Sequence, residues 1–250
     1  MLELTEEQFD FYKRNGYVFL EPLDASELAH FKELYHSDRS NFGWSWYTNS
    51  CQTINCDSLM TTPEFDGIIR HPRVLNALED LMGAPACFSE ICIRHMTAFD
   101  GEPDKGGWHR DRPHWLEHPL RIDYMQLMVY LTDVDESTHC FAISPEAFDD
   151  EILEIEDQLE KRGEVDIHGP AGSLVLFNMS HVHRAHQRVT KKERHTLQIY
   201  YGHLERPFLS NDSIIPAQFW RDHEDPEVRK FYGKLNAKTE LFLDDLKSKD

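Results

Sequence analysis

A series of short apolar segments fills the middle of the chain, and this series limits the possible folds more than any other feature. Turn-forming stretches such as DGEP at 100–103 and GPAG at 169–172 separate segments rich in β-branched and aromatic residues. Strands of this length, interrupted by Gly and Pro, predict an all-β barrel or sandwich. The predicted strands cover residues 91–99, 124–131, 140–143, 174–177, 181–186 and 196–201.

Helix signals flank this region on both sides. Thr5 and Gln8 have the spacing of a capping box, and Gly16 stands where the helix should end, before a short apolar strand at 17–20. Asp24 with Glu27 predicts a second helix, which runs to about residue 36.

Proline marks further helix starts. Pro63 and Pro72 each take the first position of a predicted helix, and Gly83 ends the later one. Pro226 opens another helix near the C-terminus, and the acidic segment 144–163 has helical spacing, so we expect it to leave the sheet.

The length of 250 residues suits one large domain, and no linker interrupts the chain. We therefore expect a single domain over residues 1–250. Its parts would be a mainly helical segment at about 1–86, a β core at about 87–204 and a helical tail at about 216–250.

Charge and cysteine usage narrow the class of protein. The formal net charge of −19 opposes binding to nucleic acid or anionic lipid, but a small anion could still be held by one or two buried arginines. The five cysteines include no Cys-x-x-Cys pair, which favours free thiols in a reducing compartment.

With no long apolar run and an acidic N-terminal segment, we predict a cytoplasmic protein that acts on a small molecule, without nucleic acid or membrane partners. The oligomeric state is left open.

The stretch GGWHRDRP at 106–113 holds the candidate site. If it is a strand, His109 and Asp111 share one face and Arg110 points to the other. An imidazole and a carboxylate on one face can converge on a metal ion, although His-x-Asp by itself is common. A third ligand has to come from elsewhere in the chain.

The segment 176–186 supplies several histidines for that role. His183 is the preferred ligand, and His181 is the main rival because it shares the same strand face. If residues 187–190 form a hairpin loop, His183 and Arg194 lie nearly opposite each other on adjacent strands. Two histidines and one carboxylate leave positions open on a metal, as in non-haem Fe(II) oxygenases, and an arginine can clamp a carboxylate bidentately.

These motifs resemble the phytanoyl-CoA dioxygenase family of Fe(II)- and 2-oxoglutarate-dependent oxygenases. The resemblance rests on His109-x-Asp111, on His183 and on Arg194, which stands eleven residues after His183. It extends to FDFYKRNGYVFL at 9–20 and to the segments LTDVD at 131–135 and CFAISP at 140–145, and so spans most of residues 5–203. The chain departs from the family's frequent Pro-Gly-Ser-His, because Glu146 follows Pro145 here.

The resemblance implies a mainly β fold with flanking helices, the double-stranded β-helix or cupin-like jelly roll. It implies that His109, Asp111 and His183 bind Fe(II), and that Arg194 binds the remote carboxylate of 2-oxoglutarate. The cofactor and cosubstrates would then be Fe(II), 2-oxoglutarate and O₂, with succinate and CO₂ as products.

Four further residues are candidates with an ordinary alternative beside each. Gln126 and Met128 share one strand face, which either touches 2-oxoglutarate or packs in the core. Trp115 follows Asp111 closely, as a candidate substrate contact or a partly buried core residue. Arg94 either reaches the pocket as a substrate contact or lies on the surface.

We therefore predict a dioxygenase that hydroxylates a small molecule. Desaturation or oxidative cyclisation would use the same residues. A jelly-roll protein that binds a metal or ligand without turnover is the rival from another class, and a CoA thioester is a weaker substrate because the acidic chain offers no evident polyanion cradle.

Overall fold

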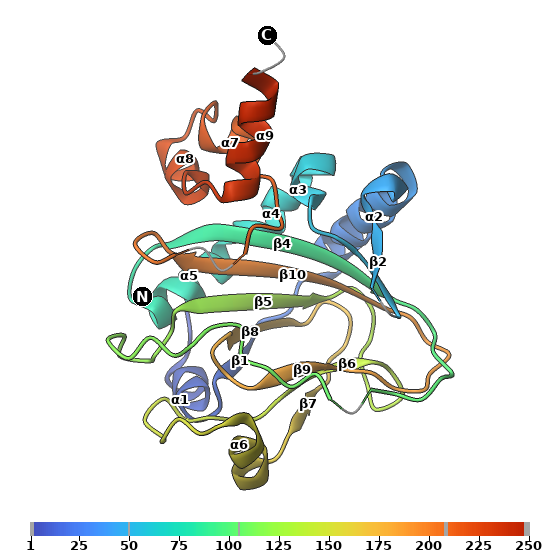
Figure 1. Ribbon diagram of the computed structural model, residues 1–250, viewed down its shortest axis with the longest axis vertical. Coiled ribbons are helices and arrows are strands. Elements are labelled where there is room, and N and C mark those ends of the chain that lie inside the picture. Colours follow the sequence, from blue (N-terminus) through green and yellow to red (C-terminus); the bar gives the residue numbers. More distant parts are fainter. Residues whose placement is uncertain (1–2, 50, 105, 208–209, 248–250) are drawn as a thin grey trace.

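Two antiparallel sheets face each other in the computed structural model, which describes residues 3–49, 51–104, 106–207 and 210–247 (Figure 1). The larger sheet has the strand order β1-β8-β5-β10-β4-β3-β2, and the smaller has the order β7-β6-β9. The strands are β1 (Tyr17–Leu20), β2 (Tyr47–Asn49), β3 (Gln52–Asn55), β4 (Ala86–Met96), β5 (Tyr124–Tyr130), β6 (Cys140–Ile143), β7 (Val165–Ile167), β8 (Leu174–Asn178), β9 (His183–His186) and β10 (Arg194–His203). Two facing sheets with flanking helices agree with the predicted jelly roll.

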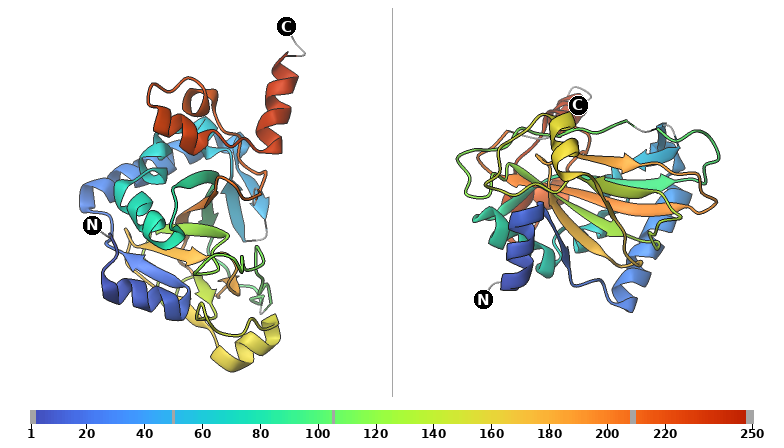
Figure 2. Two further views of the ribbon diagram at one scale, coloured as in Figure 1. Left: turned by 90° about the vertical axis from the view of Figure 1, so that its left-hand side faces the viewer. Right: turned by 90° about the horizontal axis from the view of Figure 1, so that it is seen from below.

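Helices cover the face of the larger sheet that points away from the smaller one. In Figure 1, α2, α3 and the C-terminal helices lie above β4 and β10, whereas β6, β7 and β9 lie below. Figure 2 shows α6 and the C-terminal helices at opposite ends of the molecule. The helices are α1 (Glu6–Asn15), α2 (Ala25–Asn41), α3 (Ser58–Thr61), α4 (Asp66–Ile69), α5 (Pro72–Met82), α6 (Ile155–Arg162), α7 (Ala217–Trp220), α8 (Pro226–Tyr232) and α9 (Ala237–Lys247), with 3₁₀ turns at Gly43–Ser45 and Pro63–Phe65.

Strand alternation divides the buried side chains between two cores. Along β5, Leu127 and Val129 belong to the core beneath the helices, whereas Met128 and Tyr130 point between the sheets. The same alternation along β10 places Leu197 in the core beneath the helices. The opposite faces of β4, β5 and β10 therefore point toward the smaller sheet and form one wall of the space between the two sheets.

Several sequence predictions are confirmed by the helix termini. Thr5 and Asp24 both form complete capping boxes, and Gly16 and Gly83 end their helices in the left-handed conformation. Asp225 caps α8 as expected. Local side-chain chemistry fixes these positions, so they can be read from neighbouring residues alone.

Other local predictions need correction. The helix predicted at Pro63 is a 3₁₀ turn followed by the short α4, and the helix predicted over 144–163 forms only at Ile155–Arg162. The mainly helical first third also contains the hairpin of β2 and β3, which pairs with the end of β4. These strands are short and partly polar, so tertiary pairing and not propensity makes them extended.

The predicted hairpin between His183 and Arg194 is wrong. β9 pairs with β6 in the smaller sheet, whereas β10 pairs with β4 and β5 in the larger one. Both residues do line one cavity, but from facing sheets and not from adjacent strands. Long-range pairing of this kind leaves no local signal in the sequence.

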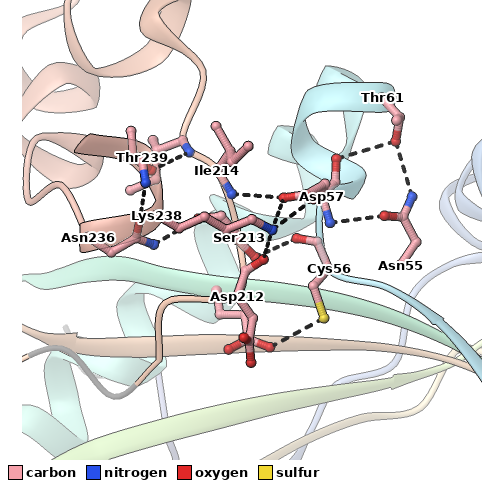
Figure 3. Close-up of polar contacts among 12 residues, drawn as sticks. Asn55, Cys56, Asp57, Thr61, Asp212, Ser213, Ile214, Asn236, Lys238 and Thr239 are labelled. Carbon is pink, nitrogen blue, oxygen red and sulfur yellow. Dashed lines mark hydrogen bonds and ion pairs between the residues drawn. The ribbon is translucent and has the colours of Figure 1, made fainter. Parts of the chain in front are cut away.

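The C-terminal segment is tied to the connection after β3 by polar contacts (Figure 3). The Lys238 ammonium pairs with both carboxylate oxygens of Asp57 at 2.8 Å. The Ser213 hydroxyl donates to the carbonyl of Cys56 at 2.6 Å, and the Asn236 amide donates to the carbonyl of Ser213 at 2.7 Å. These contacts hold α9 over the outer face of the sheet.

Within the described part of the chain, no helix combines the length and the apolar character that crossing a membrane would require.

Candidate active site

Two histidines distant in sequence are joined by their backbones. The amide of His109 donates to the carbonyl of His183 at 3.1 Å, and the amide of His183 donates to that of His109 at 3.0 Å. This isolated bridge lies at the start of β9, so His109 is in a loop held against a strand rather than in a strand of its own. The bridge sets both imidazoles side by side, with ring centroids 4.4 Å apart.

The carboxylate of Asp111 lies between the two rings. Its Oδ1 is 3.3 Å from Nε2 of His109, and its Oδ2 is 3.3 Å from Nε2 of His183. The Asp111 amide donates to the carbonyl of Met179 at 3.1 Å, which fixes the loop just before β9. Arg110 points the other way, as predicted, and its guanidinium pairs with Glu146 at 2.7 Å.

Backbone carbonyls orient both imidazoles. Nδ1 of His109 is 2.7 Å from the carbonyl of Gly107, and Nδ1 of His183 is 2.8 Å from the carbonyl of His181. A carbonyl only accepts hydrogen bonds, so each Nδ1 carries the proton and each Nε2 presents a lone pair toward Asp111. This is the tautomer and orientation of metal-binding histidines.

The charges in the cluster agree with a cation site. Burial disfavours the carboxylate of Asp111, but hydrogen bonding and attraction to His109 and His183 in their protonated form outweigh burial and hold its pKa well below the ordinary value. The neighbouring carboxylate raises the pKa of His109, chiefly by hydrogen bonding. Two imidazoles and an ionised carboxylate within 4.8 Å of one another fit a divalent ion of the iron group.

Arg194, at the start of β10, is almost fully buried on the cavity floor. Its exposed fraction is 3%. Its Nη atoms contact the sulfur atoms of Met96 and Met128 at 3.5 and 3.1 Å, and its Nε atom has no hydrogen-bond partner among the described residues. Burial lowers the pKa of its guanidinium. Among the described residues, this buried cation contacts two thioethers and the ring of Tyr130 and has no anion to balance it.

One cavity, about 140 Å³ in volume, brings these residues together. Every residue predicted for the site lines this cavity except Trp115. Arg94, Arg184 and Arg194 line it together with the carboxylate of Asp111, and Arg184 also pairs with Glu164 at 3.1 Å, so the lining is positive within an acidic chain. The lining residues are Gln52, Arg94, Met96, His109, Asp111, Gln126, Met128, Phe141, His183, Arg184, Ala185, Arg194, Thr196, Gln198 and Tyr200.

Two predicted candidates lie away from this cavity. Trp115 packs against His118 and His203, with the Arg206 guanidinium 4.7 Å from its ring centroid. His181, the rival ligand, belongs to a separate buried cluster with His114 and not to the group around Asp111. The geometry therefore favours His183 over His181.

Sequence reasoning missed several residues of the lining. Thr196, Gln198 and Tyr200 alternate with Arg194 along β10, so the period of two could have identified them. Arg184 gave no such signal: it extends from β9 to stack on Trp108, 4.6 Å from the ring centroid.

A family model assigns the chain to a known class. The model of phytanoyl-CoA dioxygenase (PhyH) matches residues 12–196, which is more than half of the chain and includes all four principal site candidates. The chain belongs to the phytanoyl-CoA dioxygenase family. As a member of this family it is an oxidoreductase, an oxygenase that depends on non-haem iron, 2-oxoglutarate and O₂. No curated protein matches the chain in sequence.

Several solved structures share the fold. The carbocyclase SnoK from nogalamycin biosynthesis is 19% identical with a TM-score of 0.68, over 83% of this chain and 89% of its own. EctD from S. alaskensis, with 2-oxoglutarate and 5-hydroxyectoine, is 14% identical with a TM-score of 0.68, over 83% and 79%. HygX from Streptomyces hygroscopicus, with nickel and 2-oxoglutarate, is 17% identical with a TM-score of 0.63, over 90% and 94%. These likenesses establish the jelly-roll fold.

Proposed function

We propose that His109, Asp111 and His183 bind the Fe(II) ion of this oxygenase. The separations of 3.3 Å between the imidazole nitrogens and the Asp111 oxygens leave room for one ion between them. Both Nε2 lone pairs point to that position because both Nδ1 atoms are engaged by carbonyls. The His109 side chain is half exposed, so this face of the ion would remain open to incoming ligands.

The observation that carries the proposal is the buried Arg194 beside this cluster. We assign it to the remote carboxylate of 2-oxoglutarate, which would supply the missing anion and take up the unpaired Nε. Gln126 and Met128, from β5, line the same floor and would confine the chain of the cosubstrate. Pairing two charges in a buried site is favourable only when the geometry is bidentate, which a guanidinium offers.

The roles of the protein groups then follow. Bound iron with 2-oxoglutarate and O₂ supplies the oxidising chemistry, with succinate and CO₂ as products. Asp111, held ionised, balances the charge of the ion. The neutral rings of His109 and His183 fix its position beneath the cavity mouth. Phe141 and the thioethers of the lining exclude water from the reacting groups.

We propose hydroxylation of a polar or anionic small molecule as the reaction. Two further arginines line the cavity. Arg184 pairs with Glu164 at 3.1 Å, whereas Nε of Arg94 is buried and has no hydrogen-bond partner in the part of the chain that the structure describes. Arg94 is our candidate for the substrate's acidic or polar group. Structural neighbours bind small molecules, since HygX has been crystallised with hygromycin B. Cyclisation or epimerisation, the activities of SnoK and SnoN, would need the same metal and cosubstrate residues.

A screen for substrate-stimulated succinate release tests this function. Purified protein, Fe(II), 2-oxoglutarate and O₂ are incubated with pools of polar and acidic metabolites, and products are identified by mass. Gain of one oxygen atom in the stimulating metabolite supports hydroxylation. Loss of two hydrogens indicates cyclisation or desaturation, and an unchanged mass with altered stereochemistry indicates epimerisation. If no iron-dependent succinate forms, either with any metabolite pool or in the absence of a pool, the result argues for a binding protein without turnover.

A further inference from the structure

Directly behind the cavity, on the outer face of the larger sheet, a second group of metal-ligating side chains comes together. His95 of β4 and His195 of β10 are register partners on adjacent strands, so both side chains point to the same face. Glu193 stands two residues before His195 and shares that face. Its Oε2 lies 3.5 Å from Nε2 of His95 and 3.4 Å from Nε2 of His195.

The distances match those of a coordinated ion. A zinc ion lies about 2.0 to 2.2 Å from imidazole nitrogen and carboxylate oxygen, and tetrahedral angles then separate two ligand atoms by about 3.3 to 3.5 Å. The candidate ligand atoms of His95, Glu193 and His195 all lie within 4.8 Å of one another. The pattern repeats that of His109, Asp111 and His183, where the corresponding separations are 3.3 Å.

A hydrogen bond from helix α2 orients one of the rings. Nδ1 of His95 is 3.0 Å from the hydroxyl of Tyr35, and that hydroxyl is 3.4 Å from the carbonyl of Arg94. The hydroxyl can donate to the carbonyl and accept from Nδ1, which leaves Nε2 of His95 as a bare lone pair facing Glu193. Two acceptors that face each other repel unless a proton or a cation lies between them.

Burial keeps both rings neutral, which is the form that binds metals. It lowers the pKa of His95, and burial together with His95 lowers the pKa of His195 to about 4. Tyr35 stacks on the His195 ring at 4.9 Å and holds it in place. The positive charge of Arg39 opposes a cation here, and the negative charge of Glu193 acts in the other direction.

We propose that His95, Glu193 and His195 form a second divalent-metal site, distinct from the iron centre, with zinc as the ion that fits it best. Glu193 is 53% exposed, so solvent can reach the ion and complete a tetrahedron with water. The site would connect β4 to β10. Arg94 and Arg194, which precede its two histidines in sequence, point to the opposite face and line the cavity. It does not depend on the function proposed for the cavity.

Zinc binding is measured on the full chain carrying Asp111→Ala, so that the iron centre has lost its carboxylate ligand. Titration against a chromophoric zinc chelator gives the affinity, and metal analysis after dialysis gives the stoichiometry. We expect a zinc ion to be retained, and its affinity to fall roughly tenfold or more when Glu193→Gln, His95→Asn or His195→Asn is added. Glu193→Gln is the sharpest variant, since an exposed side chain can change without unfolding the protein.

Two controls define the result. His30→Asn, which removes a histidine from α2 outside the site, should leave zinc affinity unchanged. Zinc should raise the Tm of the Asp111→Ala protein by more than that of the protein that also carries Glu193→Gln. The proposal is overturned if no zinc is retained, or if Glu193→Gln and His195→Asn leave affinity unchanged. Zinc lost on His114→Asn instead would assign the ion to the buried cluster of His114, Glu146 and His181, and would also overturn it.

Discussion

His109 and His183 exchange a pair of backbone hydrogen bonds, and this bridge closes the candidate iron site. His109 belongs to a loop and His183 to a strand of the smaller sheet, so the position of the His109 imidazole depends on the bridge to that strand. The bridge makes the spacing of the two rings a property of the backbone. Side-chain substitutions near the site should therefore alter metal ligation without collapsing the loop.

The choice between His183 and His181 can be tested by metal affinity. We expect His183→Ala to abolish tight Fe(II) binding, because it removes one of the three groups around the ion. His181→Asn should keep Fe(II) binding, since that ring lies in another cluster. Equilibrium dialysis under anaerobic conditions measures both. Loss of iron in His181→Asn with a folded protein, and retention in His183→Ala, would reverse the assignment.

Arg194→Ala should weaken 2-oxoglutarate binding specifically. A hydrogen bond to a charged group contributes about 1.5 to 3 kcal/mol, so the 2-oxoglutarate concentration needed for half-maximal activity should rise by roughly one to two orders of magnitude. Fe(II) affinity should change little. Pyruvate, which lacks the second carboxylate, should replace 2-oxoglutarate poorly in the wild type. Equal support of turnover by the two acids would contradict this role.

Arg94→Leu is the matched comparison, because it removes a second guanidinium from the same cavity. With the substrate identified, we expect its KM to rise while the 2-oxoglutarate requirement stays near the wild-type value. Steady-state kinetics with each reactant varied separates the two effects. If both arginine variants change only the 2-oxoglutarate requirement, Arg94 is a cosubstrate residue and not a substrate contact.

Gly16→Ala should destabilise the protein far more than Gly83→Ala. Both glycines have positive φ, 74° and 63°, which costs an L-residue about 1 to 2 kcal/mol. At Gly16 an added Cβ would also lie 1.8 Å from Nδ1 of His181, whereas at Gly83 it would meet nothing within 4 Å. Urea denaturation measures the difference. Equal losses in the two variants would show that His181 moves aside without cost.

The buried ion pairs of Glu146 should make stability depend on pH in the acid range. Burial disfavours its carboxylate, but His114 and Arg110, with His181 nearby, outweigh burial and lower its pKa to about 2. A depressed pKa stabilises the fold above the ordinary value near 4.5 and loses that effect as pH falls toward 2. The free energy of unfolding of the wild type should therefore approach that of Glu146→Gln between about pH 5 and 2. A constant difference over this range would contradict the prediction.

The sequence predicted the elements whose signals are local. Thr5 and Asp24 show the capping chemistry of their helices. Strand alternation put Gln126 and Met128 on one face, but only the structure shows that this face lines the cavity. His183 and Arg194 line one cavity as predicted, but not through the predicted hairpin, because the pairing of β9 with β6 depends on residues far away in the chain.

The second histidine cluster had no signal in the sequence at all. His95 and His195 become neighbours only through the register of β4 with β10, which no local pattern specifies. Trp115 shows the converse, since it is close to Asp111 in sequence but does not line the cavity. Its role as a substrate contact stays a prediction, as do the cytoplasmic location and the single-domain organisation.

The most direct test of the central claim is an anaerobic titration of Fe(II) into the protein with 2-oxoglutarate, followed by the visible charge-transfer absorption of the chelate. We predict a band that saturates near one iron per chain in the wild type and is absent in Asp111→Ala, because that carboxylate lies between both imidazoles. No band in the wild type, or the same band in Asp111→Ala, would contradict an iron centre formed by His109, Asp111 and His183.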